Sequence, residues 1–246
     1  MSDAMKRDML REYRRVHGEY LDGEGNREER LAWFGRFFDA NFAAHFGRKD
    51  ARILEIGCGK GYFLKVLRDR GYTDLHGIDL SEMDVDIART VFAIPNVCAA
   101  GAVPFLSMRP GTFDAIFAKD VLEHIPREDV GPFLEAARNA LAPGGTAIFQ
   151  VPNMDWAMSS HERYMDWTHE SGFTRESLGQ VMRMFFPKVE IFKVSYVFPR
   201  TLRERVSAGL VRRLYLSLCR FHLRMISEGA EDVWFECREI AAVCRT

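Results

Sequence analysis

A glycine-rich loop between Gly57 and Gly61 constrains the fold of this chain more than any other feature. Three glycines alternate with other residues there, directly after the apolar segment 51–56 and directly before a helical pattern at 62–70. Glycines at such a strand-to-helix turn let the backbone approach a ligand closely and leave amide groups pointing at it. The loop therefore predicts an α/β domain with a ligand site at the end of its first strand.

The spacing of these glycines separates two classes of ligand. A dinucleotide fingerprint has the pattern G-x-G-x-x-G, whereas here Tyr62 stands at the third glycine position and Gly61 comes one residue earlier. Asp79 ends the next apolar segment, about 20 residues past the loop, where an acid accepts hydrogen bonds from ribose hydroxyls. Together these residues predict a nucleoside ligand without a pyrophosphate, and they disfavour a hydride-transferring oxidoreductase.

Strand-like and helix-like segments alternate along the chain, which implies right-handed crossovers and a mostly parallel sheet. We expect strands at 51–56, 75–79, 96–99, 113–118, 146–151 and 188–197, with a last strand within 233–244. We expect helices at 62–70, 82–91, 129–141, 174–186 and about 200–228. Residues 1–48 form a helical extension before a domain at 49–246, and their aromatic stripe is predicted to pack on that domain; it consists of Trp33, Phe34, Phe37, Phe38 and Phe42.

Several motifs along the chain together resemble a known family. They are Glu55-x-Gly57-x-Gly59-x-Gly61, Asp79, Phe113-Asp114-x-Ile116 with Asp120-Val121-Leu122-Glu123-His124-Ile125, and Leu141-x-Pro143-Gly144-Gly145. In this order they resemble motif I, the ribose-binding acid, the fourth-strand motif and the turn into the fifth strand of class I S-adenosylmethionine-dependent methyltransferases. The resemblance covers about residues 50–245. It implies a Rossmann-like, seven-stranded, mostly parallel sheet with helices on both faces and an antiparallel last strand.

The resemblance also implies S-adenosyl-L-methionine as cofactor and outlines its site. The residues implied to bind it are Glu55, Gly57, Gly59, Gly61, Asp79, Ala118 and Lys119, the last two near its methionine part. The stretch 97–102 lacks the acid with which the family usually reads adenine, so backbone groups are expected to do so. Because related enzymes close N-terminal helices over the cofactor, Tyr13 and Tyr20 are candidates for a lid, with ordinary packing as the alternative.

The methyl acceptor is expected to bind on the segment 152–173, because ligands of open α/β sheets bind above the carboxyl ends of the strands. His169 is the favoured general base, since its unperturbed pKa of about 6.5 suits removal of a hydroxyl proton. Asp166 is its expected orienting partner. Both residues could instead hold the loop, or clamp a metal with a further acid, but no spacing is diagnostic and no metal ligand is assigned. A structural role is favoured for His124.

Three hypotheses for the function remain open. The segment that contains Asp166-x-Thr168-His169 resembles methyltransferases of surface-polysaccharide and O-antigen pathways, which implies a sugar hydroxyl on a nucleotide sugar or glycan as acceptor. Glu123-His124 also occurs in ubiquinone-biosynthesis O-methyltransferases, so a quinone-like phenol or other small metabolite is the alternative. The third hypothesis is a non-catalytic cofactor-binding module, against which the intact glycine loop and Asp79 argue.

Composition bears on the partners and the compartment. The net charge of −1 argues against a nucleic-acid scaffold. The five cysteines are odd in number and have no CxxC spacing, which is typical of a reducing compartment. No apolar stretch opens the chain and no apolar run approaches the ~20 residues of a membrane span, so we expect a cytoplasmic protein without a signal peptide.

The helix expected at about 200–228 is amphipathic. Its apolar stripe consists of Leu210, Leu214, Leu218, Phe221 and Met225, and its basic face of Arg205, Arg212, Arg213, Arg220 and Arg224. Such a helix packs on its own domain, pairs with a second subunit as a homodimer, or lies on an anionic membrane surface as a peripheral contact. The sequence leaves these three alternatives open.

Overall fold

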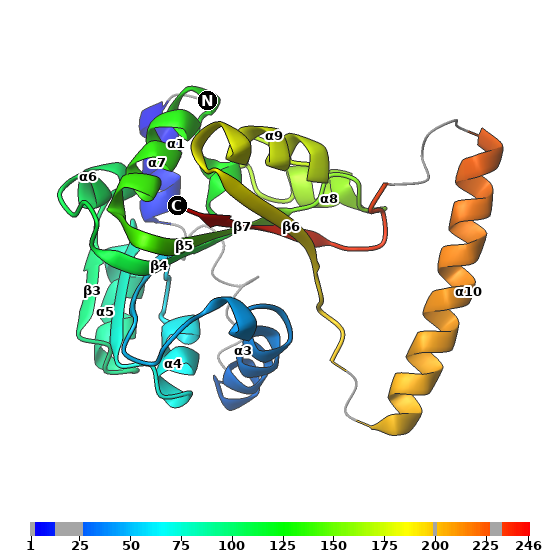
Figure 1. Cartoon of the computed structure of the whole chain (residues 1–246), viewed down its shortest axis with the longest axis horizontal. Helices are drawn as coiled ribbons and strands as arrows, with labels where there is room; N and C mark the ends of the chain where they lie inside the picture. Colours follow the sequence, from blue (N-terminus) through cyan, green and yellow to red (C-terminus); the bar gives the residue numbers. More distant parts are fainter. Residues whose placement is uncertain (1–2, 13–26, 199–200, 227–232) are drawn as a thin grey trace.

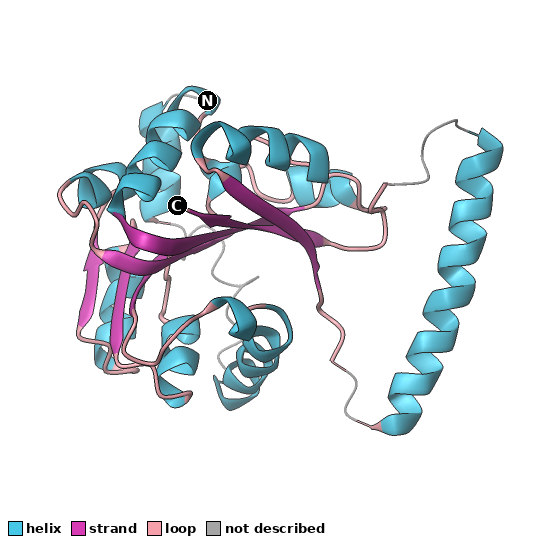
Figure 2. Ribbon diagram, in the orientation of Figure 1, coloured by secondary structure: helices cyan, strands magenta, loops and turns pink. Residues whose placement is uncertain are grey.

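The computed structural model describes residues 3–12, 27–198, 201–226 and 233–246. Its strands form one sheet with helices on both faces (Figures 1 and 2). The strands are β1 (Arg52–Ile56), β2 (Asp74–Asp79), β3 (Asn96–Ala99), β4 (Phe113–Lys119), β5 (Leu141–Pro152), β6 (Lys188–Val194) and β7 (Glu239–Arg245). Their order is β3-β2-β1-β4-β5-β7-β6, and β7 runs antiparallel to β5 and β6 while the other pairs are parallel. The predicted seven-stranded Rossmann-like sheet is confirmed.

The strand order reverses at β1, which lies between β2 and β4. The crossover from β1 to β2 runs through α4 on one face of the sheet, and the crossover from β4 to β5 runs through α7 on the opposite face (Figure 1). The loops that leave β1 and β4 therefore diverge. Such a divergence opens a crevice at the carboxyl ends of the strands, where ligands of open α/β sheets bind.

The helices enclose two hydrophobic cores, one on each face. On one face lie α3 (Arg27–Asn41), α4 (Tyr62–Asp69) and α5 (Glu82–Thr90), and on the other α6 (Ala102–Ser107), α7 (Arg127–Ala140) and α9 (Arg175–Phe185) (Figure 1). The remaining helices are α1 (Asp3–Arg11), α8 (Ser159–Tyr164), α10 (Leu202–Ile226) and the short 3-10 helices Ala43–His45 and Leu122–His124. Of the predicted aromatic stripe, Phe37, Phe38 and Phe42 are buried in one core with Phe63 and Phe117. Trp33 and Phe34 pack against this core and are half-buried.

Several boundaries differ from the sequence predictions. β5 begins at Leu141 rather than at residue 146, because Leu141 already pairs with Phe113 before a register shift in β4. Helices α6 and α8 were not predicted, since six residues are too few to show a helical period. Strand β6 ends at Val194 rather than at residue 197, and the last strand begins at Glu239. Tyr13 and Tyr20, the predicted lid residues, lie outside the described residues.

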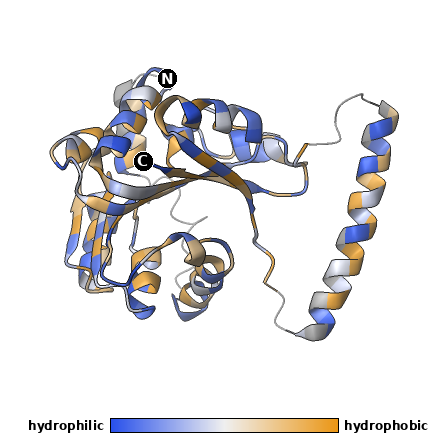
Figure 3. Ribbon diagram, in the orientation of Figure 1, coloured by the Kyte–Doolittle hydropathy of each residue, from blue (hydrophilic) through white to orange (hydrophobic). Residues whose placement is uncertain are grey.

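Helix α10 stands apart from the sheet, and apolar and polar residues alternate along it (Figures 1 and 3). Its predicted apolar stripe is 61–70% exposed at Leu210, Leu214, Leu218, Phe221 and Met225. The stripe therefore does not pack on its own domain, which corrects the first of the three alternatives. The basic side chains of Arg213, Arg220 and Arg224 are exposed, whereas those of Arg205 and Arg212 lie outside the described part. No helix in the described part of the chain is both long enough and apolar enough to cross a bilayer.

Candidate active site

A cavity of about 950 Å³ lies at the carboxyl ends of the parallel strands. Its lining comes from the loop after β1, the end of β2, the residues after β3 and β4, the segment after β5 and the start of β7. Small-molecule sites in proteins measure roughly 300–1,000 Å³, so this cavity has room for a nucleoside cofactor together with a small acceptor. It is also the place where the crevice of the sheet predicts a ligand site.

The three glycines of the first loop have different tasks. All have positive φ angles, of 72° at Gly57, 47° at Gly59 and 79° at Gly61. A Cβ atom on Gly57 would lie 2.6 Å from Cγ2 of Val121, and one on Gly61 would lie 2.8 Å from Cβ of Ala88. A Cβ atom on Gly59 would meet no atom within 4 Å. Gly57 and Gly61 are therefore needed for close packing, whereas Gly59, which lines the cavity, leaves space for a ligand.

Asp79 ends β2 and holds the glycine loop from the side. Its Oδ2 accepts a hydrogen bond from the Gly59 amide at 2.8 Å, and its Oδ1 accepts one from the Ser81 amide at 2.9 Å. Burial raises the pKa of Asp79, while these two amide bonds oppose the rise. Each carboxylate oxygen keeps a further lone pair, so Asp79 can accept a hydrogen bond from a ligand hydroxyl while it orders the loop.

Four of the predicted cofactor residues are not among the described residues that line the cavity, namely Glu55, Gly61, Ala118 and Lys119. Ala118 is 1% exposed in the core below β4, and Glu55 is buried with one carboxyl oxygen, Oε2, that lacks a hydrogen-bond partner among the described residues. Burial, with the nearby charge of Asp79, raises the pKa of Glu55 well above its usual value. Lys119 forms an ion pair with Asp120.

After β4, a pair of residues two positions later than the predicted pair reaches the cavity. Asp120 and Val121 line it, in place of Ala118 and Lys119. Asp120 adopts a left-handed φ of 53°, which turns the chain sharply out of the strand. The cavity is therefore lined by Gly57, Gly59 and Asp79 of the predicted set, together with the turn that follows β4.

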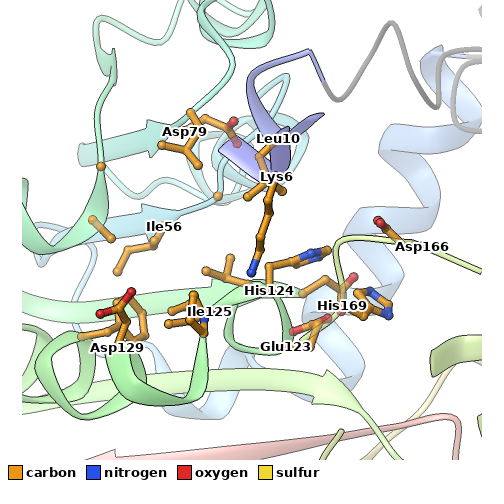
Figure 4. Close-up of a pocket in the computed structure, with 18 of the residues that line it drawn as sticks. Lys6, Leu10, Ile56, Asp79, Glu123, His124, Ile125, Asp129, Asp166 and His169 are labelled. Atoms are coloured by element: carbon orange, nitrogen blue, oxygen red, sulfur yellow. The ribbon is translucent and has the colours of Figure 1, made fainter. Parts of the chain in front are cut away.

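The opposite wall of the cavity carries Glu123, His124 and His169 (Figure 4). One ligand-capable atom from each lies within 4.8 Å of the others, and the two imidazole rings stand edge to face with centroids 4.7 Å apart. The backbone explains this meeting of distant segments. The carbonyl of Glu123 accepts hydrogen bonds from the amides of Glu170 at 2.7 Å and Ser171 at 3.1 Å. These bonds hold the segment 152–173, called the acceptor segment below, against the turn after β4.

Hydrogen bonds assign the protons of both rings. Nδ1 of His169 lies 2.9 Å from the carbonyl oxygen of Glu162, and because a carbonyl only accepts, Nδ1 carries the proton and Nε2 the lone pair. Nδ1 of His124 lies 2.8 Å from the hydroxyl of Thr168, which itself donates to Oδ1 of Asp166 at 2.7 Å. The Thr168 oxygen therefore accepts from His124, whose lone pair is also on Nε2.

Asp166 contacts Thr168 rather than Nδ1 of His169, which it was expected to orient. Its Oδ1 also accepts from the amide of Thr168 at 2.8 Å, so it orients Thr168 and, through it, His124. The contact on Nδ1 of His169 is made by the Glu162 carbonyl instead. Burial, with the nearby ring of His169, lowers the pKa of His124 to about 4, so this imidazole is neutral at physiological pH.

The N-terminal helix α1 lies against the same cavity. Lys6 and Leu10 line it, and Lys6 extends between Asp79 and the wall that carries His124 (Figure 4). The ammonium group of Lys6 is 2.7 Å from the carboxylate of Glu170, and the Lys6 side chain is only 7% exposed. This ion pair links α1 to the acceptor segment.

The charge of the lining fits a cationic ligand. Among the described residues that line the cavity, two are basic, Lys6 and Arg238, whereas nine are acidic, namely Asp79, Asp84, Asp120, Glu123, Glu128, Asp129, Glu162, Asp166 and Glu239. A concave site lined by one sign of charge attracts the opposite sign. The sulfonium of S-adenosylmethionine is such a cation. Asp79 suits the ribose hydroxyls of this ligand, and the open space at Gly59 lets the ligand approach the protein backbone.

Comparison with known proteins assigns the family. Residues 25–188 match the family model described as "Methyltransferase domain". The chain belongs to this family. The methyltransferase domain resembles a SAM-dependent methyltransferase from Archaeoglobus fulgidus with a TM-score of 0.64 at 19% identity, over 95% of this chain and 99% of that one. The phosphoethanolamine N-methyltransferase 2 of Haemonchus contortus, in complex with S-adenosyl-L-methionine, gives a TM-score of 0.60 at 19% identity, over 98% of this chain and 60% of that one.

Curated relatives of the methyltransferase domain match a shorter stretch. The ubiquinone biosynthesis O-methyltransferase of Caulobacter sp. (strain K31) is 34% identical over 131 residues, which cover 52% of this chain and 49% of that protein. The protein of the same description from Neisseria meningitidis serogroup C (strain 053442) is 27% identical over 114 residues, covering 44% and 47%. The chain thus spans about half the length of the curated relatives it matches.

Proposed function

We propose that this protein transfers the methyl group of S-adenosylmethionine to a hydroxyl group of a small, phenol-like molecule. The observation that carries the proposal is one cavity with two different walls: the glycine loop and Asp79 on one side, and Glu123, His124 and His169 on the other. The names of the curated relatives favour the quinone-like phenol over the sugar hydroxyl that the acceptor segment suggested. The acidic lining also disfavours acceptors that carry phosphate, such as nucleotide sugars.

Each wall has a separate task in the proposed reaction. When bound, the cofactor supplies an electrophilic methyl group, whose bond to sulfur breaks as the bond to the acceptor oxygen forms, leaving S-adenosylhomocysteine. Gly59 permits close approach of the backbone, and Asp79 accepts hydrogen bonds from the ribose. Backbone groups of residues 100–104, which line the cavity without a charged side chain, contact the adenine. Nε2 of His169 takes the proton of the acceptor hydroxyl.

We propose that α1, within the N-terminal extension 1–48, acts as a lid on the cavity of the domain formed by residues 49–246. The buried contact of Lys6 with Glu170 supports this role, because it closes α1 over the segment that meets the acceptor. A lid that excludes water would strengthen the electrostatic contacts inside the cavity.

We infer that α10 binds an anionic membrane surface. Its exposed apolar stripe lies beside arginines, of which Arg213, Arg220 and Arg224 are exposed, and this combination is typical of helices that lie in a lipid interface. All five cysteines are free thiols, which favours a membrane surface that faces the cytoplasm. A homodimer through the same stripe is the alternative outcome of the test given in the Discussion.

The experiment that tests the enzymatic proposal combines binding with an acceptor screen. We expect S-adenosylhomocysteine to bind with one site per chain in calorimetry. Purified protein, supplied with methyl-labelled cofactor, is expected to label simple phenols and catechols and not nucleotide sugars. Failure of S-adenosylhomocysteine to bind would refute the cofactor assignment, and labelling of the nucleotide sugars alone would replace the acceptor.

A further inference from the structure

We propose that Glu123, His124 and His169 bind a divalent transition-metal cation. The inference deepens the proposed function, on which it rests only for the role of the ion and not for its binding. No spacing along the chain predicted this site, because the third residue comes from a segment remote in sequence. The cluster also differs from the metal clamp considered from sequence, since the partner of His169 is Glu123 rather than Asp166.

The distances suit one ion. The three candidate ligand atoms already lie within 4.8 Å of one another. Zn²⁺ binds carboxylate oxygen and imidazole nitrogen at about 2.0–2.2 Å, so two of its ligand atoms lie at most ~4.4 Å apart. Small side-chain rotations would therefore close the cluster on an ion.

Glu123 supplies an independent observation. Its side chain is 2% exposed, and neither carboxyl oxygen has a hydrogen-bond partner within the described residues. A buried polar group without a partner is costly, and a buried charge is normally paired or bound to a metal. The Lys119 ammonium nearby is already paired with Asp120. A cation at the cluster would give both oxygens of Glu123 the partner they lack.

The outer contacts of the two histidines fit the same assignment. Metal-bound histidines usually donate their second ring N–H to a carbonyl or a carboxylate, which fixes the ring and leaves the other nitrogen for the metal. His169 donates from Nδ1 to the Glu162 carbonyl. His124 donates from Nδ1 to Thr168, whose hydroxyl is in turn held by Asp166. In both rings Nε2 therefore lies on the side of the ring away from these contacts.

The donor set favours particular ions. Imidazole nitrogens suit Zn²⁺, Fe²⁺ and Ni²⁺, whereas Mg²⁺ and Ca²⁺ prefer oxygen ligands throughout. Three protein ligands leave a coordination position open, and all three residues line the cavity. A hydroxyl group of the acceptor would bind at that position, and the cation would lower the pKa of this hydroxyl so that its proton passes to solvent water. With the ion bound, Nε2 of His169 is a ligand, and it takes the proton of the acceptor hydroxyl itself only in protein without the ion.

The test measures metal binding directly on the full-length protein. Chelator-treated protein is titrated with Zn²⁺ in calorimetry without cofactor, and with Co²⁺ followed by visible absorption. We expect one Zn²⁺ per chain and Mg²⁺ binding at least ~100-fold weaker. Glu123→Gln and His169→Ala should each lower Zn²⁺ affinity by at least ~100-fold. Thr168→Val, which removes the hydroxyl that links His124 to Asp166, should lower it by ~10–100-fold.

Matched controls come from the same cavity. Glu128→Gln and Asp129→Asn alter acids that line the cavity outside the cluster, so their Zn²⁺ affinity should match that of the wild type. Thermal melting shows whether each variant is folded. Absence of Zn²⁺ binding, or Zn²⁺ binding that Glu123→Gln and His169→Ala leave unchanged, would overturn the site.

The test of the metal site can fail without the proposed enzymatic function failing, and the reverse also holds. Binding of S-adenosylhomocysteine is measured on the same chelator-treated protein, where we expect it to persist because the glycine loop lies on the other wall. Methyl transfer that continues at full rate in the chelated protein would overturn the role of the ion and leave the enzymatic proposal intact. Zn²⁺ binding at the cluster without methylation of any phenol would support the site and overturn the acceptor assignment.

Discussion

At Gly59 and Gly71 the backbone has φ angles of 47° and 88°, and in both places a Cβ atom would meet nothing within 4 Å. Only Gly59 lines the cavity. A valine at either position imposes similar left-handed strain, but only Gly59→Val would also put a side chain where the cofactor approaches.

We therefore expect Gly59→Val to lower S-adenosylhomocysteine affinity by at least ~100-fold, equivalent to about 2.7 kcal/mol, and Gly71→Val to leave it unchanged. Calorimetry gives the affinities, and thermal melting compares the strain in the two variants. Equal affinities for the two variants would place the cofactor elsewhere.

His169 and His161 provide a second comparison of single residues. Both belong to the segment after β5, but His161 is exposed on α8 while His169 lines the cavity. We expect His169→Ala to lower kcat by about 100- to 10,000-fold, without a comparable loss of S-adenosylhomocysteine affinity. His161→Ala should keep wild-type turnover. A turnover of His169→Ala within a few-fold of the wild type would remove this residue from the reaction.

At the scale of elements, α3 and the turn after it attach the N-terminal part to the sheet. Phe42 is fully buried, and its ring centroid lies 5.0 Å from that of Phe117 on β4 and 5.3 Å from that of Phe37. These contacts make α3 part of the same core as β4.

Removal of the Phe42 ring should therefore destabilise the whole domain. We expect Phe42→Ala to lower the free energy of unfolding by about 3–5 kcal/mol, from lost burial and the cavity left behind. Met184→Ala, at a side chain 79% exposed on α9, should change it by less than about 0.5 kcal/mol. Denaturant unfolding measures both values. A loss at Phe42 as small as that at Met184 would mean that α3 is not part of the cooperative core.

At the scale of the whole molecule, α10 is the element that the domain itself leaves uncovered. We expect the protein to co-sediment with vesicles of anionic lipid at low salt and to be released as salt rises, because arginines contribute electrostatic attraction to the surface. Arg213→Glu with Arg220→Glu should abolish this binding. Arg127→Glu with Lys188→Glu, an equal change of charge at exposed residues elsewhere, should preserve most of it.

The same helix distinguishes a membrane contact from a homodimer. Absence of vesicle binding at low salt would overturn the membrane proposal. Sedimentation of the free protein as a dimer that Leu214→Ser converts to a monomer would assign the apolar stripe to a subunit contact instead.

Local patterns in the sequence were sufficient for the order of the strands, and they pointed to the glycine loop and the acid that line one wall of the cavity. The strand–glycine–helix unit, Asp79 at the end of the next strand and the antiparallel last strand follow from residues close together in the chain or from a family resemblance. Such features can be recognised from the sequence because each depends on the conformation of a few neighbouring residues. Short helices such as α6 and α8 were missed because six residues do not display a period.

Only the tertiary structure brought His124 to His169 and gave Glu123 its place beside them. The hydrogen bonds from the amides of Glu170 and Ser171 to the Glu123 carbonyl join two segments remote in sequence, and no pattern within either segment specifies that pairing. The left-handed turn at Asp120 likewise decided which residues after β4 reach the cavity. Catalytic geometry depends on contacts between distant segments, and these form only when the sheet has brought the carboxyl ends of its strands to one edge.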